Sequence, residues 1–328
     1  MNERKTGEIL LTETKNATGG YKLTPYYHNV IQKGDVASSY IYALQMHSSE
    51  SKTLVTRRSI SSGSIGLNPM LLMTGTAGGH TQTWEYAGNG YWFIGTKPQS
   101  DGSHNWDIQI ARVKYPSSGT RQYTSNTQLT RLSHINRAGW DHNNDYDGDY
   151  LHRVEAAVSP NYDELLIASI DTDGNGYFTR YDLNMINNEL DNNPGDDVSL
   201  WNLSSIDSFK IPNLTDSSVI GSIQGYDIDE NNNIIISSEY SKDYSGTERK
   251  IYIIPWGATS KSQWTYVDLS TNGQNASYAQ NNIDISGYYT EFESVQVIGI
   301  NDVYLTISYH NSTSGTTEFS RIIEVTWN

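Results

Sequence analysis

Short apolar segments alternate with polar turns along the chain, and one such unit recurs. The segment QTWEYAGNGYWFIGT (82–96) aligns without gaps with EAAVSPNYDELLIAS, QGYDIDENNNIIISS and ESVQVIGINDVYLTI. The four segments start at residues 82, 155, 224 and 293, which are 73, 69 and 69 residues apart. Each begins with Gln or Glu, enters a short strand, turns through polar residues or glycine, and continues into an apolar strand. Spacing this regular indicates a repeat fold.

Further strands follow each of these hairpins. Third strands are predicted from Trp106, Gly176, Lys250 and Arg321, and fourth strands from Gln128, Asp207 and Trp264. A divergent first copy comprises 29–32, 39–45, 53–59 and 67–73. The period and the strand count predict an all-β fold, a five-bladed β-propeller of four-stranded blades in a single domain, 1–328. The expected blades are 29–73, 80–135, 153–214, 222–270 and 291–327.

The last of the five units lacks a fourth strand, because the chain ends at EVTWN. An unassigned apolar segment, GEILLTE (7–13), lies near the other end. We therefore predict that 7–13 pairs with the last blade as its outermost strand and closes the ring, which leaves no long strand edge exposed. A ring closed in this way needs no partner to cover its edges, so a monomer is expected.

Composition excludes several classes of function. The formal net charge is −15, from 37 acidic and 22 basic residues, and Lys and Arg form no stripe, so nucleic acid is not an expected partner. The absence of cysteine excludes disulfides, thiolate metal sites and cysteine nucleophiles. No apolar run approaches the length of about 18 residues that a membrane-spanning helix needs. The first 15 residues contain no apolar core of a signal peptide.

Long polar loops are predicted at one end of the ring. In a propeller, the turns between second and third strands and the connections from a fourth strand to the next blade lie on the same face. Here these segments are rich in Tyr, Trp, Asn, Asp, Ser and Gly, which suits sugar binding, because aromatic rings stack on sugar C–H faces while amides and carboxylates bind hydroxyls. The candidate stacking rings are Trp140, Tyr146, Tyr150, Tyr288 and Tyr289.

The inner strands carry a second candidate set. Gln82, Glu155, Gln224 and Glu293 occupy equivalent positions, and His80, Arg153, Ser222 and Glu291 stand two residues earlier, on the same side of each strand. These side chains either bind a hydroxylated ligand or an ion, or they satisfy one another and the water of the channel. The expected ligand-binding residues of the channel are His80, Gln82, Arg153, Glu155, Gln224, Glu291 and Glu293.

Two kinds of chemistry were weighed against these residues. Glycoside hydrolysis needs two carboxylates, roughly 5–9 Å apart, and the candidates are Glu155 or Glu293 as the acid, with Glu291 and Asp149 as further carboxylates. The glutamines at the equivalent positions weaken this hypothesis, and no enzymatic motif is present.

Calcium binding is the second kind. Asp171, Asp173 and Asn175 alternate as in a calcium loop, but the Asp-Gly and Asn-Gly pairs favour a hairpin turn. The acidic loop at 141–149 could also supply calcium ligands, but its composition favours a solvated loop. The histidines show no HExxH spacing, so a zinc hydrolase is not expected. No cofactor is therefore predicted, with Ca²⁺ as the alternative.

Several longer motifs resemble a known family. The segments AGGHTQTWE (77–85), WFIGTKP (92–98), QIARV (109–113), RLSHINRAG (131–139), EAAVSP (155–160), SIQGYDID (222–229), ESVQVIG (293–299) and the terminal EVTWN are similar to the helveticin J family, large heat-labile bacteriocins of lactobacilli. The resemblance implies a secreted antibacterial protein without a recognisable leader, acting on related Gram-positive bacteria. It brings no catalytic residues to positions of this chain.

Together these observations predict a secreted or surface-associated protein that recognises a cell-wall glycan, or another surface component, of related bacteria and inhibits them. Two alternatives stay open. The first is a cell-wall glycoside hydrolase that uses the channel carboxylates. The second is a carbohydrate-binding module that attaches to cells without killing them.

Overall fold

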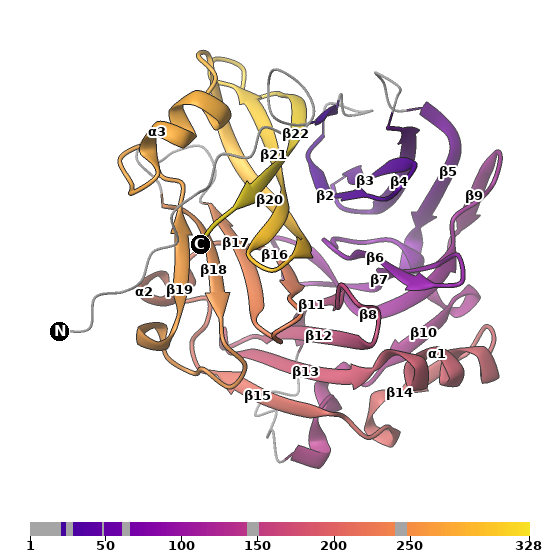
Figure 1. Cartoon of the computed structure of the whole chain (residues 1–328). Helices are drawn as coiled ribbons and strands as arrows, with labels where there is room; N and C mark the ends of the chain where they lie inside the picture. The colour runs from indigo at the N-terminus through magenta and orange to yellow at the C-terminus, as the bar shows by residue number, and fades with distance from the viewer. Residues whose placement is uncertain (1–20, 24–28, 48, 61–65, 143–150, 240–247) are drawn as a thin grey trace.

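Five small, mainly antiparallel sheets surround a common centre, so the chain folds as the predicted five-bladed β-propeller (Figure 1). The structure is a computed structural model that describes residues 21–23, 29–47, 49–60, 66–142, 151–239 and 248–328. The innermost strands contact one another in sequence order, β2, β6, β11, β16 and β20, and β20 contacts β2 again. The ring is therefore continuous at its centre.

Each blade runs outward from its innermost strand. Blade 1 contains β2 (Ile31–Val36), β3 (Tyr40–His47), β4 (Lys52–Ser59) and β5 (Gly66–Thr74). Blade 2 contains β6 (Trp84–Gly88), β7 (Tyr91–Ser100), β8 (Asn105–Lys114) and β10 (Thr130–Ser133). Blade 3 contains β11 (Leu151–Val158), β12 (Glu164–Asp171), β13 (Gly176–Asp182) and β15 (Asp207–Ile211). Blade 4 contains β16 (Ile223–Ile228), β17 (Ile234–Glu239), β18 (Arg249–Ile254) and β19 (Thr265–Asp268). Blade 5 contains β20 (Tyr288–Gly299), β21 (Asp302–Asn311), β22 (Thr317–Thr326) and β1 (Tyr21–Leu23).

The structure differs from four-stranded blades in two places. β9 (Thr120–Tyr123) pairs in parallel with β5, and β14 (Asp197–Ser199) pairs in parallel with β10, so blades 1 and 2 have five strands. Each added strand comes from the following blade, where it lies in the connection between the third and fourth strands. These connections cross to the neighbouring blade and cover its outer edge.

The outer edge of β22 is paired antiparallel with β1, Tyr21–Leu23. The segment predicted for this role, 7–13, lies outside the described residues. Since a strand from the N-terminal part of the chain pairs with the last strand, chain segments about 300 residues apart meet in blade 5.

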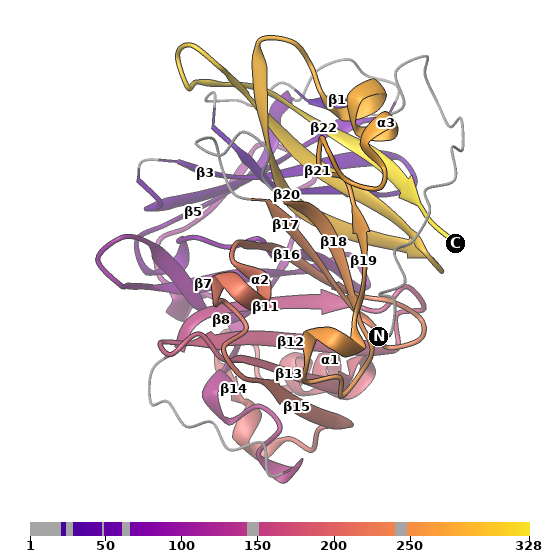
Figure 2. The same ribbon diagram turned by 90° about the vertical axis from the view of Figure 1, so that its left-hand side faces the viewer.

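Helices are short and lie in the connections. They are α1 (Leu183–Asn192), α2 (Ser217–Ile220), α3 (Ala276–Tyr278), the π-turn η7 (Ala279–Ile283) and the 3₁₀ turns η1 (Gly75–Ala77), η2 (Asn126–Gln128), η3 (Ile135–Arg137), η4 (Trp140–His142), η5 (Leu200–Asn202) and η6 (Lys261–Gln263). Asp182 caps α1 by accepting the Met185 N–H at 2.7 Å, a common start signal. Figure 2 shows α3 beside β22, where the Tyr278 hydroxyl donates to the Glu324 carbonyl at 3.1 Å. In the described part of the chain, no helix is long and apolar enough to span a membrane.

The core fills the spaces between adjacent blades. Between blades 1 and 2, the fully buried Trp84 stacks on Trp92 with ring centroids 4.7 Å apart, and Tyr42 lies 4.5 Å from Trp92. The buried face of α1 joins the cluster between blades 2 and 3 through Leu183, Ile186 and Leu190. Because side chains alternate along each strand, the two faces of every blade contribute to two such layers.

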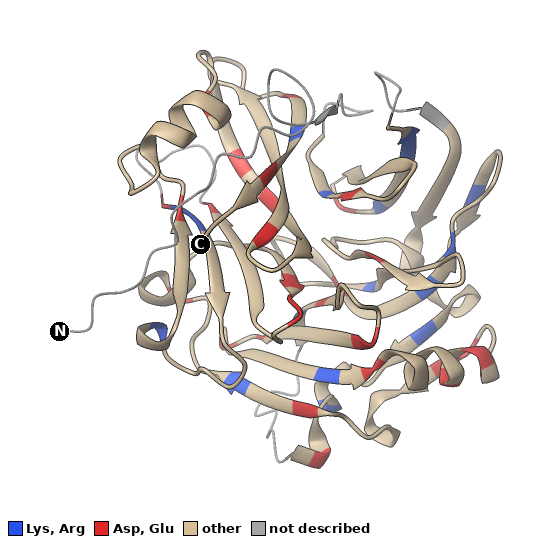
Figure 3. Cartoon of the chain, in the orientation of Figure 1, with Lys and Arg blue, Asp and Glu red and all other residues tan. Residues whose placement is uncertain are grey.

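One end of the ring is formed by the turns between second and third strands and by the connections between blades. We call it the loop face. On this face the β3–β4 turn of blade 1 approaches the β7–β8 turn and the β5–β6 connection of blade 2, as the contacts among Glu50, His80 and His104 show. Figure 3 shows acidic positions on the strands that surround the centre of the ring.

Candidate binding site at the channel mouth

The Gln82 side chain forms hydrogen bonds with three other side chains of the channel. Its Nε2 donates to Gln224 Oε1 and to Glu293 Oε2, both at 3.2 Å, and its Oε1 accepts a hydrogen bond from Arg153. Arg153 also donates to the carbonyls of Ile223, at 2.9 Å, and Gln224. The structure thus brings together the equivalent channel positions that the repeat singled out.

Glu155 connects blades 2 and 3. Its carboxylate accepts the Gln82 backbone N–H at 3.0 and 3.1 Å, the hydroxyls of Thr83 at 2.5 Å and Thr81 at 3.3 Å, and the Arg153 Nε–H at 3.1 Å. The side chain is buried, and these five bonds occupy both oxygens. Glu155 therefore stabilises the junction between the blades.

Glu239, which the sequence did not point to, has the same role between blades 4 and 5. It accepts hydrogen bonds from the Phe292 N–H at 2.8 Å, the Thr290 hydroxyl at 2.7 Å and Arg249 Nε at 2.9 Å.

Glu293 is also buried. Burial, together with the neighbouring carboxylates Glu291 and Glu239, raises the pKa of Glu293 well above its usual value and so favours its protonated form. Glu291 itself lies against His310, 3.2 Å from its Nε2. Burial leaves Glu155 and Glu293 poorly placed to act on a soluble saccharide.

Deeper in the channel lies a buried charged cluster that the sequence analysis did not identify. Lys33 Nζ lies 2.6 Å from Glu85 Oε1 and donates to the Val295 carbonyl at 2.6 Å. Although burial opposes it, the carboxylates of Glu85, Asp227 and Asp35 raise the pKa of Lys33. Burial and the charge of Glu85 raise the pKa of Asp35 to about 8, against the effect of Lys33. The charge of Lys33 thus interacts with three acidic groups from three blades: Asp35 of blade 1, Glu85 of blade 2 and Asp227 of blade 4.

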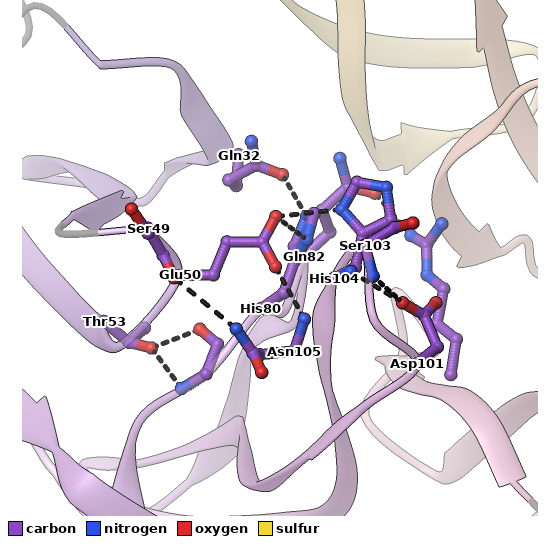
Figure 4. Close-up of polar contacts among 12 residues, drawn as sticks. Gln32, Ser49, Glu50, Thr53, His80, Gln82, Asp101, Ser103, His104 and Asn105 are labelled. Carbon is purple, nitrogen blue, oxygen red and sulfur yellow. Dashed lines mark hydrogen bonds and ion pairs between the residues drawn. The ribbon is translucent and has the colours of Figure 1, made fainter.

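At the loop face, Glu50, His80 and His104 converge (Figure 4). Glu50 Oε1 lies 3.1 Å from His80 Nδ1 and 3.0 Å from His104 Nδ1. His80 stacks on Trp106 with ring centroids 3.5 Å apart, and its Nε2 lies 3.2 Å from Gln32 Oε1. Of these residues, the sequence analysis had singled out His80 alone.

The electrostatics of this group follow from its surroundings. Burial lowers the pKa of His80, and the nearby Arg153 acts in the same direction against Glu50, so the ring is neutral at pH 7. Although partial burial opposes ionisation, the contact with His104 at 3.0 Å and the Asn105 N–H at 2.7 Å help to lower the pKa of Glu50 to about 2. A carboxylate therefore faces two imidazole rings.

Local backbone geometry fixes His80 in place. His80 N donates to the Asn105 carbonyl at 2.7 Å, and Asp107 N donates to the His80 carbonyl at 2.9 Å, which forms a parallel bridge. Gly79 permits this approach, since a Cβ there would lie 2.3 Å from Asp107 Oδ1. Thr53 holds Gly79 from the blade 1 side, through bonds of 2.6 and 3.0 Å.

A pocket of about 290 Å³ adjoins this group between blades 1 and 5. Most of the surface that lines it is apolar, although six of the eight lining residues carry amide, hydroxyl, imidazole or carboxylate groups: Asn29, Gln32, His47, Ser49, Glu50 and Thr317, beside Val30 and Met46. Thr317 lies 3.1 Å from His310 Nδ1, and the His310 ring stacks on Tyr289 with centroids 4.8 Å apart. This aromatic pair lies next to Thr317 on the blade 5 side and is not itself part of the lining.

The remaining candidate rings lie in different places. Tyr288 is half-buried, with its ring edge-on to Phe319. Trp140 lies in η4 and is 50% exposed. Asp141, also in η4, accepts hydrogen bonds from the N–H and the hydroxyl of Ser205, which lies between β14 and β15 in the chain. Within the described part of the chain, Trp140 makes no contact with the residues that line the pocket. Tyr146, Asp149 and Tyr150 lie outside the described residues.

The loop with the calcium-like pattern is a hairpin turn. Asp171 Oδ1 accepts the N–H groups of Asp173 and Asn175 at 2.9 Å, and Oδ2 accepts the Asn175 amide and the Tyr177 hydroxyl at the same distance. Asp229 forms the same bonds with Asn231 and Asn233 in blade 4. The repeated geometry explains the Asp-rich pattern through turn formation.

The structure thus defines a class of protein: a five-bladed β-propeller with a polar pocket at the mouth of its channel. The family model described as bacteriocin helveticin-J matches residues 12–328, and the chain belongs to this family, as its motifs predicted. It is 40% identical over 346 residues to bacteriocin helveticin-J of Lactobacillus helveticus, an alignment that covers 97% of this chain and 99% of that protein.

Solved structures are similar to this chain at a much lower level. An α-L-arabinofuranosidase of Podospora anserina, in complex with cellotriose, is 8% identical, with coverage of 98% of this chain and 94% of that chain and a TM-score of 0.45. A protein of unknown function from Dyadobacter fermentans is 9% identical, covering 90% of this chain and 75% of that chain, with a TM-score of 0.42. Likeness at this level supports no conclusion about activity.

Proposed function

We propose that this chain is a secreted antibacterial protein that binds a hydroxyl-rich component of the cell wall of related Gram-positive bacteria through its loop face and inhibits their growth. The observation that carries the proposal is the match to bacteriocin helveticin-J, which extends over nearly the full length of both chains. An antibacterial protein of this kind has to recognise its target cell from outside, and the loop face offers the pocket for that contact.

The chemistry of the pocket supports a polyhydroxylated ligand. Asn29, Gln32 and Ser49 offer amide and hydroxyl groups, and Glu50 offers a carboxylate acceptor. Val30 and Met46 add apolar surface, which suits the C–H faces of a sugar ring. A site with a few polar groups beside apolar surface fixes both the orientation and the identity of a small ligand.

Hydrolysis of the wall has less support. Glu155 is saturated with hydrogen bonds and buried, Glu293 is buried, and neither lines the pocket. The proposed role is therefore binding, and a soluble-sugar assay distinguishes the two functions.

The test measures binding of the purified chain to cell walls of related lactobacilli by co-sedimentation, with growth inhibition of the same strains measured in parallel. We expect Tyr289→Ala to weaken wall binding by about 2–10-fold, since stacking contributes about 0.5–1.5 kcal/mol. Tyr162→Ala is the matched control, because Tyr162 is an exposed tyrosine in the β11–β12 turn, at the end of the ring opposite the loop face.

Trp140→Ala extends the test over the loop face. If the binding surface reaches blade 3, this variant binds walls more weakly without a lower melting temperature. Wild-type protein that neither sediments with walls nor inhibits growth would refute the proposal. Release of soluble sugar that disappears in Glu155→Gln or Glu293→Gln would replace it with the hydrolase.

A further inference from the structure

The convergence of Glu50, His80 and His104 calls for an explanation beyond hydrogen bonding. They come from two blades and from three separate segments, yet their ligand-type atoms all lie within 4.8 Å of one another. The Nδ1 atoms of both histidines lie close to the same carboxylate oxygen, at 3.1 and 3.0 Å. Carboxylate and imidazole together are the donor set of zinc and of related transition metals.

The protonation pattern leaves a gap at His80. Its Nε2 faces Gln32 Oε1 at 3.2 Å, an arrangement in which Nε2 carries the proton and Nδ1 has a free lone pair. That Nδ1 is buried and, among the described residues, has no hydrogen-bond partner of suitable geometry, although Glu50 Oε1 is only 3.1 Å away. A neutral Nδ1 beside a carboxylate oxygen leaves two electron-rich atoms next to each other with no proton between them, and a cation bound to both atoms offsets this.

We propose that Glu50, His80 and His104 form a binding site for a transition metal ion of the Zn²⁺ class at the rim of the loop-face pocket. Glu50 Oε1 and the two Nδ1 atoms are the ligands. With bond lengths of about 2.0–2.1 Å, two ligand atoms of a tetrahedral zinc ion lie about 3.3 Å apart. The two separations between Glu50 Oε1 and the Nδ1 atoms, 3.1 and 3.0 Å, are close to this value, and the two Nδ1 atoms lie within 4.8 Å of each other.

The surroundings meet the further requirements of a metal site. Gln32 and the stacked Trp106 orient the His80 ring, as outer partners of metal-bound histidines do. The His104 side chain is 50% exposed, while those of Glu50 and His80 are 19% and 10% exposed, so an ion has a path from solvent. Three protein ligands leave a fourth position for water or a ligand oxygen. Glu50 and Gln32 also line the pocket, which places that position beside it.

The experiment titrates the full-length protein, freed of metal by EDTA and dialysis, with ZnCl₂ in a calorimeter. We expect one Zn²⁺ per chain in the wild type and binding at least tenfold weaker in Glu50→Gln and His104→Ala. His104 is half exposed, so its replacement leaves the core in place, and circular dichroism checks the fold of both variants. Titration with Co²⁺ adds a spectroscopic readout, since a four-coordinate site with nitrogen ligands gives a visible absorption band.

His142→Ala is the matched control, because His142 is a surface histidine near Asp207 that lies outside the group. The proposal is overturned if wild-type protein binds no Zn²⁺, or if Glu50→Gln and His104→Ala bind it as tightly as the wild type. The first result favours a hydrogen-bonded cluster with the Gln32 amide turned over and the proton on His80 Nδ1, and the second means that zinc binds elsewhere on the chain. Equal loss in His142→Ala identifies non-specific histidine binding and overturns it as well. Wall binding is measured both with EDTA and with Zn²⁺, so that failure of the metal site can be told apart from failure of the proposed function.

Discussion

Replacing Lys33 with methionine tests whether the buried cluster in the channel holds the inner strands together. Lys33 Nζ contacts Glu85 Oε1 and the Val295 carbonyl, each at 2.6 Å, and the side chains of Lys33 and Glu85 are 1% and 8% exposed. Methionine keeps most of the length of the side chain but removes the charge and the donor. It leaves Glu85, Asp227 and Asp35 buried without their cation.

The expected loss is about 3–5 kcal/mol in the free energy of unfolding at pH 8, the cost of removing one partner of a buried ion pair. This is a large share of the roughly 5–15 kcal/mol that stabilises a typical folded protein. The loss should be smaller at pH 5. Without Lys33, the three carboxyl groups have raised pKa values, and at lower pH they take up protons and become neutral.

Urea denaturation at both pH values, followed by tryptophan fluorescence, measures the change. Lys250→Met is the matched control, because the buried Lys250 side chain pairs at 2.8 Å with Glu248, whose side chain is 63% exposed, so the carboxylate left behind is solvated. Loss of such a pair costs about 1 kcal/mol or less. A Lys33→Met protein that loses no more than the control, or whose loss is the same at pH 5 and pH 8, would show that the reasoning is wrong.

Two further predictions concern the channel. Burial and Glu85 raise the pKa of Asp35 to about 8, so folding favours its protonated form; the resulting stability is complete below about pH 4 and lost as the pH rises through about 8. Between pH 5.5 and pH 8.5, the urea midpoint should therefore decrease more in the wild type than in Asp35→Asn. An equal decrease in both proteins would show that Asp35 does not have the raised pKa. Glu155→Gln should lower the free energy of unfolding by about 1.5–3 kcal/mol, because it weakens the hydrogen bonds to Arg153 and to blade 2. Glu164→Gln is the control: it alters the more exposed pair with Arg180 and should cost about 1 kcal/mol or less. Thermal unfolding measures both variants, and equal shifts would refute the role of Glu155 as a junction.

Part of the candidate site was predictable from the repeat. Aligning the copies placed Gln82, Gln224 and Glu293 at equivalent positions, and the structure joins them by hydrogen bonds. The function of Glu155 was less predictable, because its partners Thr81 and Thr83 belong to the preceding blade and no pattern within blade 3 marks them. A carboxylate suited to catalysis and one that joins two blades look the same in a sequence.

The group at the pocket was missed for a related reason. Glu50 and His104 stand in equivalent turns of adjacent blades, and His80 stands in the connection between them. The expected loop face already placed these segments at one end of the ring, so an acidic residue and a histidine in neighbouring turns were a usable signal. What the alignment lacked was the angle between the blades, which decides whether two such turns touch.

The sequence by itself determined the number of blades, their hairpins and the family, because strand alternation and polar turns are local properties that repeat with the chain. The tertiary structure alone decided how the blades meet. It paired β9 with β5 and β14 with β10 across blade boundaries, placed Lys33 among three carboxyl groups, and brought Glu50 and two histidines to one point. These contacts join residues distant in the chain, and their energies depend on burial and distance, which exist only once the ring has closed.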